Sequence, residues 1–373
     1  MTQRTALIAT PYFAPRTGGL EKYAEQSAHA LANAGWNVVV VCGAEVKKPT
    51  RTAENGLIIW RLPIWRTASN TPINFMWPVY LRRIIKSEKP TVINAHTPVP
   101  FMVDMVTLVA GNIPVVVTYH AATLTKPASP LLAAITQIYT AFERLTLARS
   151  KHIIAVSEYV QSGLAPRLRA KSSVIYNAVT GISSQKPAGN GLVFVANLSH
   201  AHSWKGLDLI LEALAACTKP LPAALHLTVI GDGDRRDHYE RKAAQLGLAD
   251  TVTFTGRKTG ADRDAIMSQA ASLITYPTTG NDAFPTVILE AWSLGLGVIA
   301  SAIGPIPSLI QPGVTGLLAK PRNPAALAEC LQAYAKQPEV SRNYGAAGQR
   351  LITSTYNWDV QGKKFAALME SVS

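Results

Sequence analysis

Two carboxylates, eight residues apart, are the first feature of this 373-residue sequence that suggests chemistry. Asp282 and Glu290 flank a Phe-Pro pair. Pro285 suits the start of a helix, because its missing N–H would be unpaired there in any case. Apolar residues then recur at helical spacing until a glycine-rich stretch ends the element. One acid therefore precedes a helix and the other lies inside it, at the helix end that attracts anions.

Three other places along the chain could contact a ligand. Gly18 and Gly19 follow a predicted strand and precede a helix, where their backbone can approach a phosphate, although an ordinary turn also fits. His120 and Asn177 each end a predicted strand, which is where open parallel sheets bind ligands, but a structural role fits both equally. Lys205 precedes a predicted helix, so it is either a phosphate clamp or a solvated lysine.

These residues are placed by alternating strands and helices. Predicted helices separate the predicted strands, at 19–35, 207–217, 239–247 and from 285 onward. Further helical stretches lie between the strands of the first half. Such alternation predicts an α/β fold with parallel sheets covered on both faces. The predicted strands span residues 6–12, 37–43, 91–96, 114–120, 152–157, 173–177, 191–197, 226–232, 251–256, 272–277 and 297–301.

A polar segment, SSQKPAGN at 183–190, looks like a linker between two domains. The strand-helix pattern restarts after it, so we expect two similar α/β domains at 1–185 and 186–355. The last segment, 356–373, is predicted to be a helix that crosses back to the first domain.

Charge is distributed unevenly between the two predicted domains. The chain has 36 Lys and Arg against 23 Asp and Glu, a net charge of +13. Residues 1–185 hold 19 Lys and Arg and 8 Asp and Glu, a net charge of +11, so the net charge of residues 186–373 is +2. This asymmetry suggests an anionic partner for the first half, and the candidates are nucleic acid, an acidic membrane and a phosphorylated substrate. A basic surface that only keeps the protein soluble is the other explanation. The segment at 74–89 mixes aromatic and basic residues, which suits either an anionic membrane surface or an ordinary helix covering a sheet.

Other features narrow the location and the class of protein. No apolar run is long enough to span a bilayer, and the N-terminus lacks a cleavage pattern. The three cysteines are far apart, as in a reduced cytosol, so we expect a cytoplasmic protein. No nucleic-acid-binding module is present, and "VIGDGDRRD" has Arg236 where a dinucleotide fingerprint needs its third glycine.

Two groups that could bind a metal ion have simpler explanations. Asp232 and Asp234 could hold a divalent cation, but a tight turn after a strand explains them as well and is preferred. His200 and His202 lack a third ligand at suitable spacing, so no metal site is predicted.

Several stretches, in this order and spacing, resemble the retaining glycosyltransferase family 4. They are TGGLEKYA, VVVTYHA, IIAVSEYV, VIYNAV, WKGLDLILEAL, VIGDGD, VTFTG and DAFPTVILEAWSLGLGVIAS, and the resemblance covers nearly the whole chain. It implies a GT-B fold, with two Rossmann-like domains facing across a cleft. It also implies transfer of a sugar from a nucleotide-diphosphate sugar to an acceptor hydroxyl, with retention and without an essential metal or other cofactor.

The resemblance also assigns roles around the two acids. Glu290 would accept hydrogen bonds from the ribose, and Asp282 would contact the donor sugar and steady charge at its anomeric carbon. The N–H groups of Thr286 and Val287 would face the diphosphate, in a donor-binding segment that also includes Phe284 and Pro285.

The remaining roles follow from other matching stretches. Lys205 would neutralise the leaving diphosphate, and His120 would face the transferred sugar, so the predicted catalytic residues are His120, Asp282 and Lys205. Gly18, Gly19 and Asn177 would complete the donor site. Acceptors in this family are often glycans or lipid-linked, which favours cell-surface glycan or glycolipid synthesis and peripheral contact with an anionic membrane at the inner face.

Two departures from the family pattern keep an alternative open. The first acid is usually Glu, whereas here it is Asp282, one methylene shorter. A usual basic residue is replaced by Asn197, so Lys205 would hold the phosphate alone or with Arg257, Lys258 or a histidine from 200–202. A non-catalytic protein that binds nucleotide sugars on the same fold is the alternative that these departures support.

Overall fold

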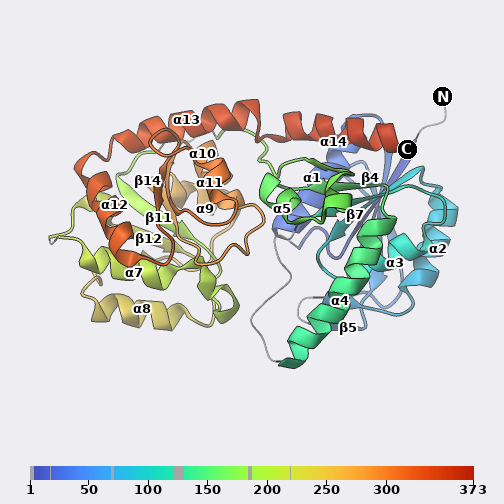
Figure 1. Cartoon of the computed structure of the whole chain (residues 1–373), viewed down its shortest axis with the longest axis horizontal. Coiled ribbons are helices and arrows are strands. Elements are labelled where there is room, and N and C mark those ends of the chain that lie inside the picture. The colour runs from blue at the N-terminus through green and yellow to red at the C-terminus, as the bar shows by residue number, and fades with distance from the viewer. Residues whose placement is uncertain (1–3, 17, 69–70, 121–129, 184–186, 219) are drawn as a thin grey trace. The chain divides into compact units, whose positions relative to one another are not determined.

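The computed structural model describes residues 4–16, 18–68, 71–120, 130–183, 187–218 and 220–373, with the backbone alone at 68, 130–138 and 141. The chain divides into two compact units (Figure 1). Unit 1 comprises Met1–Ala178 together with Trp358–Ser373, and unit 2 comprises Val179–Asn357. The division therefore lies at residue 179 and again at residue 358, whereas the sequence boundaries were placed at 186 and 356. The first of those boundaries, 185/186, lies outside the described residues.

Unit 1 is built on one eight-stranded sheet in the order β10-β9-β8-β7-β1-β2-β4-β3. All neighbours are parallel except β3 and β4, and a separate antiparallel hairpin is formed by β5 (Arg66–Ala68) and β6 (Thr71–Ile73). The chain order along the sheet reverses between β1 and β7, and such a switch point is where Rossmann-like sheets bind ligands. The strands are β1 (Thr5–Thr10), β2 (Asn37–Ala44), β3 (Thr50–Glu54), β4 (Leu57–Pro63), β7 (Val92–Thr97), β8 (Val115–Tyr119), β9 (His152–Ala155) and β10 (Ser172–Val174).

Helices cover both faces of the unit-1 sheet because its strands are apolar on both sides. In β1, Ala6 and Ile8 join the core under α1 (Gly19–Asn33) and α14 (Trp358–Val372). Leu7 and Ala9 face the opposite core. That second core is closed by α2 (Trp77–Glu88), α3 (Met102–Val109) and α4 (Pro130–Arg149), while α5 (Glu158–Gly163) and α6 (Pro166–Arg169) complete the unit.

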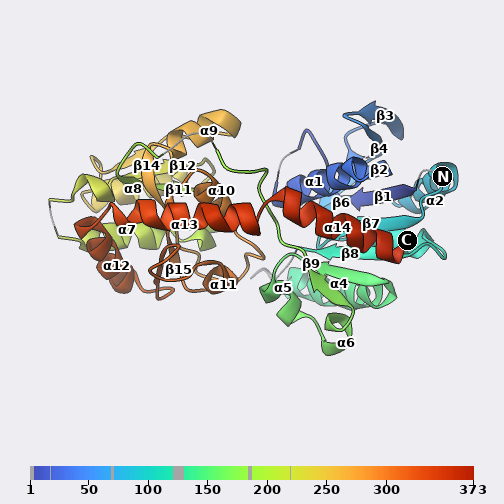
Figure 2. The same cartoon turned by 90° about the horizontal axis from the view of Figure 1, so that it is seen from above.

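The C-terminal helix α14 belongs to unit 1, as expected from the sequence. It lies along α1 in both views (Figures 1 and 2), and Phe365 and Met369 are fully buried there. A side chain at position 362 would lie 2.9 Å from the Cβ of Ala30, so glycine permits this close packing. Gln361 Oε1 also accepts a hydrogen bond from Tyr176 N, at 3.1 Å.

Unit 2 has a six-stranded, fully parallel sheet in the order β13-β12-β11-β14-β15-β16. Its strands are β11 (Gly191–Val195), β12 (Leu227–Ile230), β13 (Val252–Phe254), β14 (Ala270–Thr275), β15 (Gly297–Ser301) and β16 (Leu317–Ala319). This is the strand order of a Rossmann fold, with the switch point between β11 and β14. Its helices are η1 (His200–Lys205), α7 (Leu207–Ala216), η2 (Ala223–Leu225), α8 (Arg236–Gln245), α9 (Gly260–Met267), α10 (Thr286–Ser293), α11 (Ile306–Leu309), α12 (Pro324–Lys336) and α13 (Val340–Ser354).

The prediction of two Rossmann-like α/β domains is confirmed by these two sheets. One feature of unit 1 differs from the sequence analysis, because the antiparallel edge pair β3–β4 was not predicted. The segment at 74–89 had two explanations, and the full burial of Trp77 on α2 fits an ordinary helix that covers the sheet.

Candidate active site

Lys205 and Asp282 come from the two strands that flank the switch point of the unit-2 sheet. Lys205 ends η1, which follows β11, and Asp282 lies in the loop that follows β14. Two contacts tie these segments together. Gly206 has a φ of +82°, and a side chain there would lie 1.9 Å from the carbonyl oxygen of Tyr276, so only glycine fits. Thr278 N also donates to Trp204 O at 2.8 Å.

The result is an ion pair at the predicted donor site. Lys205 Nζ donates to Asp282 Oδ2 at 2.6 Å, and the two side chains are 25% and 18% exposed. The ammonium also lies 4.3 Å from the ring centroid of Trp204, a cation–π arrangement. Solvent still reaches both charged groups, so an anionic ligand can approach the ammonium.

The N-terminus of α10 has no side-chain cap within the described residues. Pro285 occupies the N-cap position, one residue before the helix rather than inside it, and Asp282 pairs with Lys205 instead of capping. Helix N-termini carry unpaired N–H groups and a partial positive charge. The N–H groups of Thr286 and Val287 lie at this end, and their contact with a phosphate stays a prediction.

Glu290 is held by a residue that the sequence analysis did not single out. Arg263 on α9 donates from Nη1 to Glu290 Oε2 at 3.0 Å, and from Nη2 to Asp264 Oδ1 at 2.8 Å. The side chains of Arg263 and Glu290 are both largely buried. Paired with an arginine, Glu290 keeps its orientation on α10, which a carboxylate that binds two hydroxyls requires.

Other predicted donor-site residues have structural partners. The ring of Phe284 is buried and lies 5.9 Å from that of Tyr356, and Pro285 is buried beside it, so this pair anchors the loop before α10. At the family's basic position, Asn197 Oδ1 accepts from Ser199 N at 2.9 Å and shapes the turn into η1. Arg257 and Lys258 are exposed.

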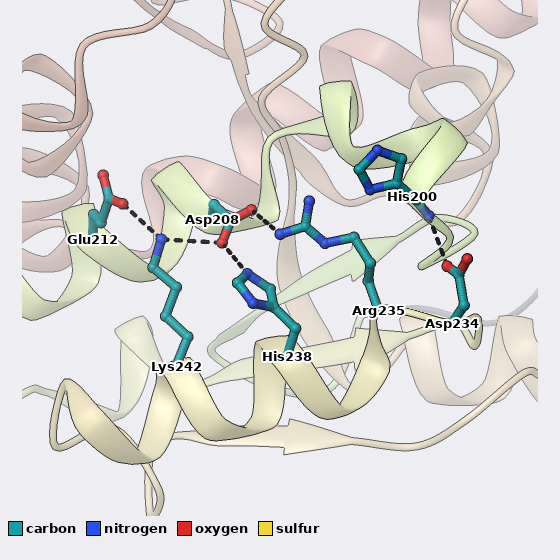
Figure 3. A network of polar contacts seen from close by, with 7 residues as sticks. All are labelled: His200, Asp208, Glu212, Asp234, Arg235, His238 and Lys242. Atoms are coloured by element: carbon teal, nitrogen blue, oxygen red, sulfur yellow. Dashed lines mark hydrogen bonds and ion pairs between the residues drawn. The ribbon is translucent and has the colours of Figure 1, made fainter.

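The carboxylates of Asp232 and Asp234 each accept a hydrogen bond from a backbone N–H, which is local for Asp232 and from a distant segment for Asp234. Asp232 Oδ1 accepts from Gly233 N at 2.8 Å, and Asp234 Oδ1 accepts from His200 N at 2.7 Å (Figure 3). Among the described residues, no three His, Cys, Asp or Glu side chains are grouped as metal ligands would be.

A second polar network joins α7 to α8. Asp208 accepts from His238 at 2.9 Å, from Lys242 at 3.0 Å and from Arg235 at 3.3 Å, and Lys242 also donates to Glu212 (Figure 3). Burial raises the pKa of Asp208, but the hydrogen bonds from His238 and Lys242 outweigh it and hold the pKa below its ordinary value. A hollow of about 490 Å³ is lined in part by Asp208 and Arg235, and also by Trp204 and Gly206, which flank Lys205 in the chain.

In unit 1, His120 lies at the carboxyl end of β8 and contacts a second histidine. His96 Nδ1 is 3.0 Å from His120 Nε2, and the ring planes are nearly parallel, with 24° between them. Tyr23 on α1 packs edge-on against both rings, and its hydroxyl donates to Ile175 O at 3.1 Å. His96, which the sequence analysis did not identify, is fully buried, and His120 is half-buried.

The other predicted residues of unit 1 lie near the ends of its strands. Gly18 is the N-cap of α1, and the carboxylate of Glu21 lies against its Cα, close enough to collide with any side chain at position 18. A side chain at Gly19 would meet open space. Asn177 is buried, with Oδ1 accepting from Ala178 N at 2.9 Å. The ligand roles of these three residues stay predictions.

Comparison with known protein families gives two matches that together cover most of the chain. Residues 17–180 match the model described as Glycosyltransferase Family 4, and residues 182–351 match Glycosyl transferases group 1. The chain belongs to glycosyltransferase family 4. It is thus a glycosyltransferase, in a family that transfers sugars with retention.

Individual relatives agree with this assignment along the full length of the glycosyltransferase. A phosphatidyl-myo-inositol mannosyltransferase of Mycobacterium leprae is 25% identical, over 97% of this chain and 96% of its own. Among solved structures, a sucrose-phosphate synthase of Thermosynechococcus elongatus is 20% identical, covers 99% of both chains and has a TM-score of 0.79. HepE of Anabaena, solved in complex with UDP, is 16% identical, covers 99% of this chain and 100% of its own, and has a TM-score of 0.75. These two structures share the GT-B fold.

Unit 1 of the glycosyltransferase also contains a buried acidic cluster that sequence reasoning missed. Glu143 on α4 is 5% exposed, and burial raises its pKa to about 7. Tyr119, at the end of β8, is hydrogen-bonded to it. The buried Glu143 Oε1 has no hydrogen-bond partner in the described parts of the chain, and Thr97 and Tyr139 belong to the same group and are hydrogen-bonded to each other. No sequence pattern predicts this group, because its members come from two strands and a helix.

One face of unit 1 exposes aromatic side chains. Trp65 is 56% exposed and Phe75 is 73% exposed, with their ring centroids 6.3 Å apart. Met76 and Val79 are also exposed beside them in sequence, and Arg82, Arg83 and Lys86 form the exposed side of α2. We call these seven residues the aromatic-basic patch. In the described chain, every helix falls short of the length and apolarity needed to cross a membrane.

Proposed function

We propose that this glycosyltransferase holds a nucleotide-diphosphate sugar on unit 2 and transfers the sugar to a hydroxyl of a lipid-linked acceptor at an anionic membrane surface. The observation that carries the proposal is the arrangement at the unit-2 switch point. There Asp282, the N-terminus of α10 and Glu290 lie in one continuous loop-helix segment, and Lys205, at the end of η1, pairs with Asp282. An ammonium, a helix N-terminus and two carboxylates match the charge pattern of a nucleotide-diphosphate sugar, which is anionic in its middle and hydroxylated at both ends.

Each residue then has a role that follows from its chemistry. Glu290, oriented by Arg263, accepts hydrogen bonds from the ribose hydroxyls. The N–H groups of Thr286 and Val287 bind the diphosphate, and Lys205 neutralises the charge that grows on it as it leaves. Asp282 contacts the sugar hydroxyls and stabilises positive charge at the anomeric carbon.

Transfer with retention follows from a front-face substitution. The bond between the anomeric carbon and the diphosphate oxygen breaks, and the acceptor hydroxyl attacks the same face. The departing diphosphate oxygen takes the acceptor's proton, so no separate base is needed. Catalysis is then mainly positioning and electrostatic stabilisation of an oxocarbenium-like state. Because Lys205 supplies the positive charge, we further propose that no metal is essential, and activity should persist in EDTA.

The acceptor side of the proposal depends on unit 1. Residues 1–185 carry a net charge of +11, and the aromatic-basic patch includes both exposed rings and exposed arginines. Aromatic side chains partition to the membrane interface, and each Lys or Arg near an anionic surface contributes about 1 kcal/mol. A relative of this chain is named for action on phosphatidyl-myo-inositol, an anionic lipid, which supports a lipid-linked acceptor.

A panel of UDP-, GDP- and ADP-sugars tests the donor part of the proposal. We expect one nucleotide to raise the melting temperature of the full chain, because a ligand that binds only the folded state stabilises it. The same nucleotide should have a smaller effect on Glu290→Gln. A panel without any stabilising nucleotide, followed by calorimetry that also finds no binding, would contradict the donor site.

A further inference from the structure

The contact between His96 and His120 limits how His120 can meet a ligand. Nε2 of His120 is 3.0 Å from Nδ1 of His96, so this nitrogen is already engaged inside unit 1. The imidazole has only one other nitrogen, Nδ1, and within the described part of the chain it has no hydrogen bond. His120 is half-buried, whereas His96 is completely buried. Any polar contact of His120 with a ligand must therefore use Nδ1.

The surroundings of His96 indicate which of the two contacting nitrogens carries the proton. One proton lies in the contact, so one nitrogen donates and the other accepts. His96 Nε2 is buried without a partner among the described residues. If His120 donated, a neutral His96 would carry its own proton on this Nε2, as an orphaned buried N–H, which is rare in folded proteins. If His96 donates from Nδ1, its Nε2 carries no proton and the orphaned donor is avoided.

We propose that His96 is a positioning residue that donates from Nδ1 to Nε2 of His120, and so holds His120 as the tautomer that presents an Nδ1–H donor to a sugar or acceptor hydroxyl. The ligand in this statement rests on the proposed function, whereas the tautomer does not. The role differs from that of a general base, because a ring that carries its proton on the ligand side donates a hydrogen bond and cannot accept a proton there.

Burial keeps both histidine rings neutral, and packing against Tyr23 keeps them in place. Burial lowers the pKa of His120 to about 3, and burial together with the neighbouring His120 lowers the pKa of His96 well below its ordinary value. Both rings thus stay uncharged near neutral pH. Tyr23 packs edge-on against both, 4.9 Å from His120 and 5.9 Å from His96 between ring centroids, and it is itself held by its bond to Ile175 O. The ring planes are therefore restrained from a second side.

The tautomer can be read directly from long-range ¹⁵N–¹H correlation spectra of the full chain labelled at histidine. The ring nitrogens of the two neutral tautomers have different ¹⁵N shifts, so each spectrum shows which nitrogen carries the proton. His96→Asn and His120→Asn assign the signals by loss, and the exposed His226 of unit 2 is the internal reference. We expect the Nδ1–H form for both His96 and His120. An Nε2–H form of His120 would overturn the proposal.

Turnover measurements separate positioning from packing. Asparagine can place its amide N–H near the position of Nδ1, so His96→Asn should keep turnover within about threefold of wild type, whereas His96→Leu should lose about tenfold or more. The Michaelis constant for the donor should change little in either. Equal losses in the two variants would show that His96 only fills space, and would overturn the proposal.

Asn94 provides the matched control on the same strand. Its Nδ2 donates to Thr118 Oγ1 at 2.8 Å and to Val116 O at 3.1 Å, so it joins β7 to β8 without touching His120. Asn94→Ala should lower the melting temperature but leave the His120 tautomer unchanged.

Should no nucleotide sugar bind while the Nδ1–H form is seen, the proposed function fails and the tautomer stands. Should a nucleotide sugar bind while His120 is in the Nε2–H form, the tautomer is overturned and the donor site stands.

Discussion

Lys205 Nζ lies 2.6 Å from Asp282 Oδ2, across the switch point of the unit-2 sheet. The two charges largely cancel, so a diphosphate that binds the ammonium must share it with the carboxylate or displace it. Mutations can therefore separate the roles of the two side chains. Removing the lysine makes the site more negative toward a diphosphate, whereas removing the aspartate charge makes it more positive.

Lys205→Ala should lower turnover by about 100-fold, since it removes the charge that stabilises the leaving diphosphate. Steady-state rates with a saturating donor give the measurement. Lys336→Ala, at an exposed position on α12, is the matched control and should keep the wild-type rate. A wild-type rate in Lys205→Ala would assign the task to another basic residue, such as Arg257 or Lys258.

Asp282→Asn should bind the free nucleoside diphosphate at least as tightly as wild type, because the ammonium of Lys205 loses its competing carboxylate. Sugar transfer should nevertheless slow by about tenfold or more, since the charge opposite the anomeric carbon is lost. Titration calorimetry and rate measurements on the same preparation test both halves. Weaker diphosphate binding in Asp282→Asn would mean that the pair has a structural role only.

Glu290→Gln should weaken binding of the nucleotide sugar by about tenfold, because a charge-assisted hydrogen bond becomes a neutral one. Arg263→Met should weaken it as well, since Glu290 loses the group that orients it. Affinities come from calorimetry, with Glu329→Gln, an exposed residue of α12, as the control. Unchanged affinity in Glu290→Gln would refute the ribose contact.

Membrane contact should depend on the aromatic-basic patch. The full chain should co-sediment with anionic vesicles at low salt and be released at high salt, because surface potentials decay within about 8 Å at physiological ionic strength. Arg82→Glu with Arg83→Glu should reduce binding by about tenfold or more, and Phe75→Ser should reduce it too. Binding to neutral vesicles should be weak.

The control for the vesicle experiment is a second double charge reversal, Arg342→Glu with Arg350→Glu, at exposed positions of α13 in unit 2. It changes the net charge equally and should leave vesicle binding nearly unchanged. If both double variants lose binding to the same extent, net charge rather than the patch is responsible. If wild type itself fails to sediment, the excess charge of unit 1 serves a soluble anionic acceptor or no specific partner.

Glu143 should make the stability of unit 1 depend on pH. Burial raises its pKa from the ordinary 4.5 to about 7, so the folded state binds the proton more tightly than the unfolded state. The stability gained from that proton is complete below the ordinary value and is lost as the pH rises through about 7. At about pH 8, Glu143→Gln should therefore be more stable than wild type by up to about 3 kcal/mol, and at about pH 4 the difference should vanish.

Melting temperatures of the two proteins across this range give the test of the Glu143 prediction. Glu339→Gln, at an exposed position, should follow wild type at every pH. A difference between Glu143→Gln and wild type that is constant with pH would show that the carboxyl does not titrate in this window.

Much of the fold followed from local pattern. Buried apolar runs predicted the parallel strands, and their alternation with helices predicted two Rossmann-like units, because both faces of such sheets are covered. The edge pair β3–β4 was missed, since Thr50–Glu54 is polar and mostly exposed. The Asn55-Gly56 turn between its strands, with φ of +50° and +78°, was a hairpin signal that could have revealed it.

The candidate site was only partly visible in the sequence. Asp282, Glu290 and Lys205 were found by motif, but the contact between Lys205 and Asp282 joins residues 77 positions apart and required the fold. Arg263 and His96 were missed because each acts through a partner that lies far along the chain, 27 and 24 positions away. Such partners belong to no motif and are set by which strands and helices the topology brings together.

Transfer of labelled sugar tests the central claim most directly. The full chain is incubated with each UDP-, GDP- and ADP-sugar, labelled in the sugar, together with vesicles of extracted anionic lipid. The account predicts that one donor yields a labelled lipid, that Lys205→Ala and Glu290→Gln abolish most of this product, and that Lys336→Ala does not. A labelled product formed equally well by Lys205→Ala and Glu290→Gln would contradict the donor site proposed on unit 2.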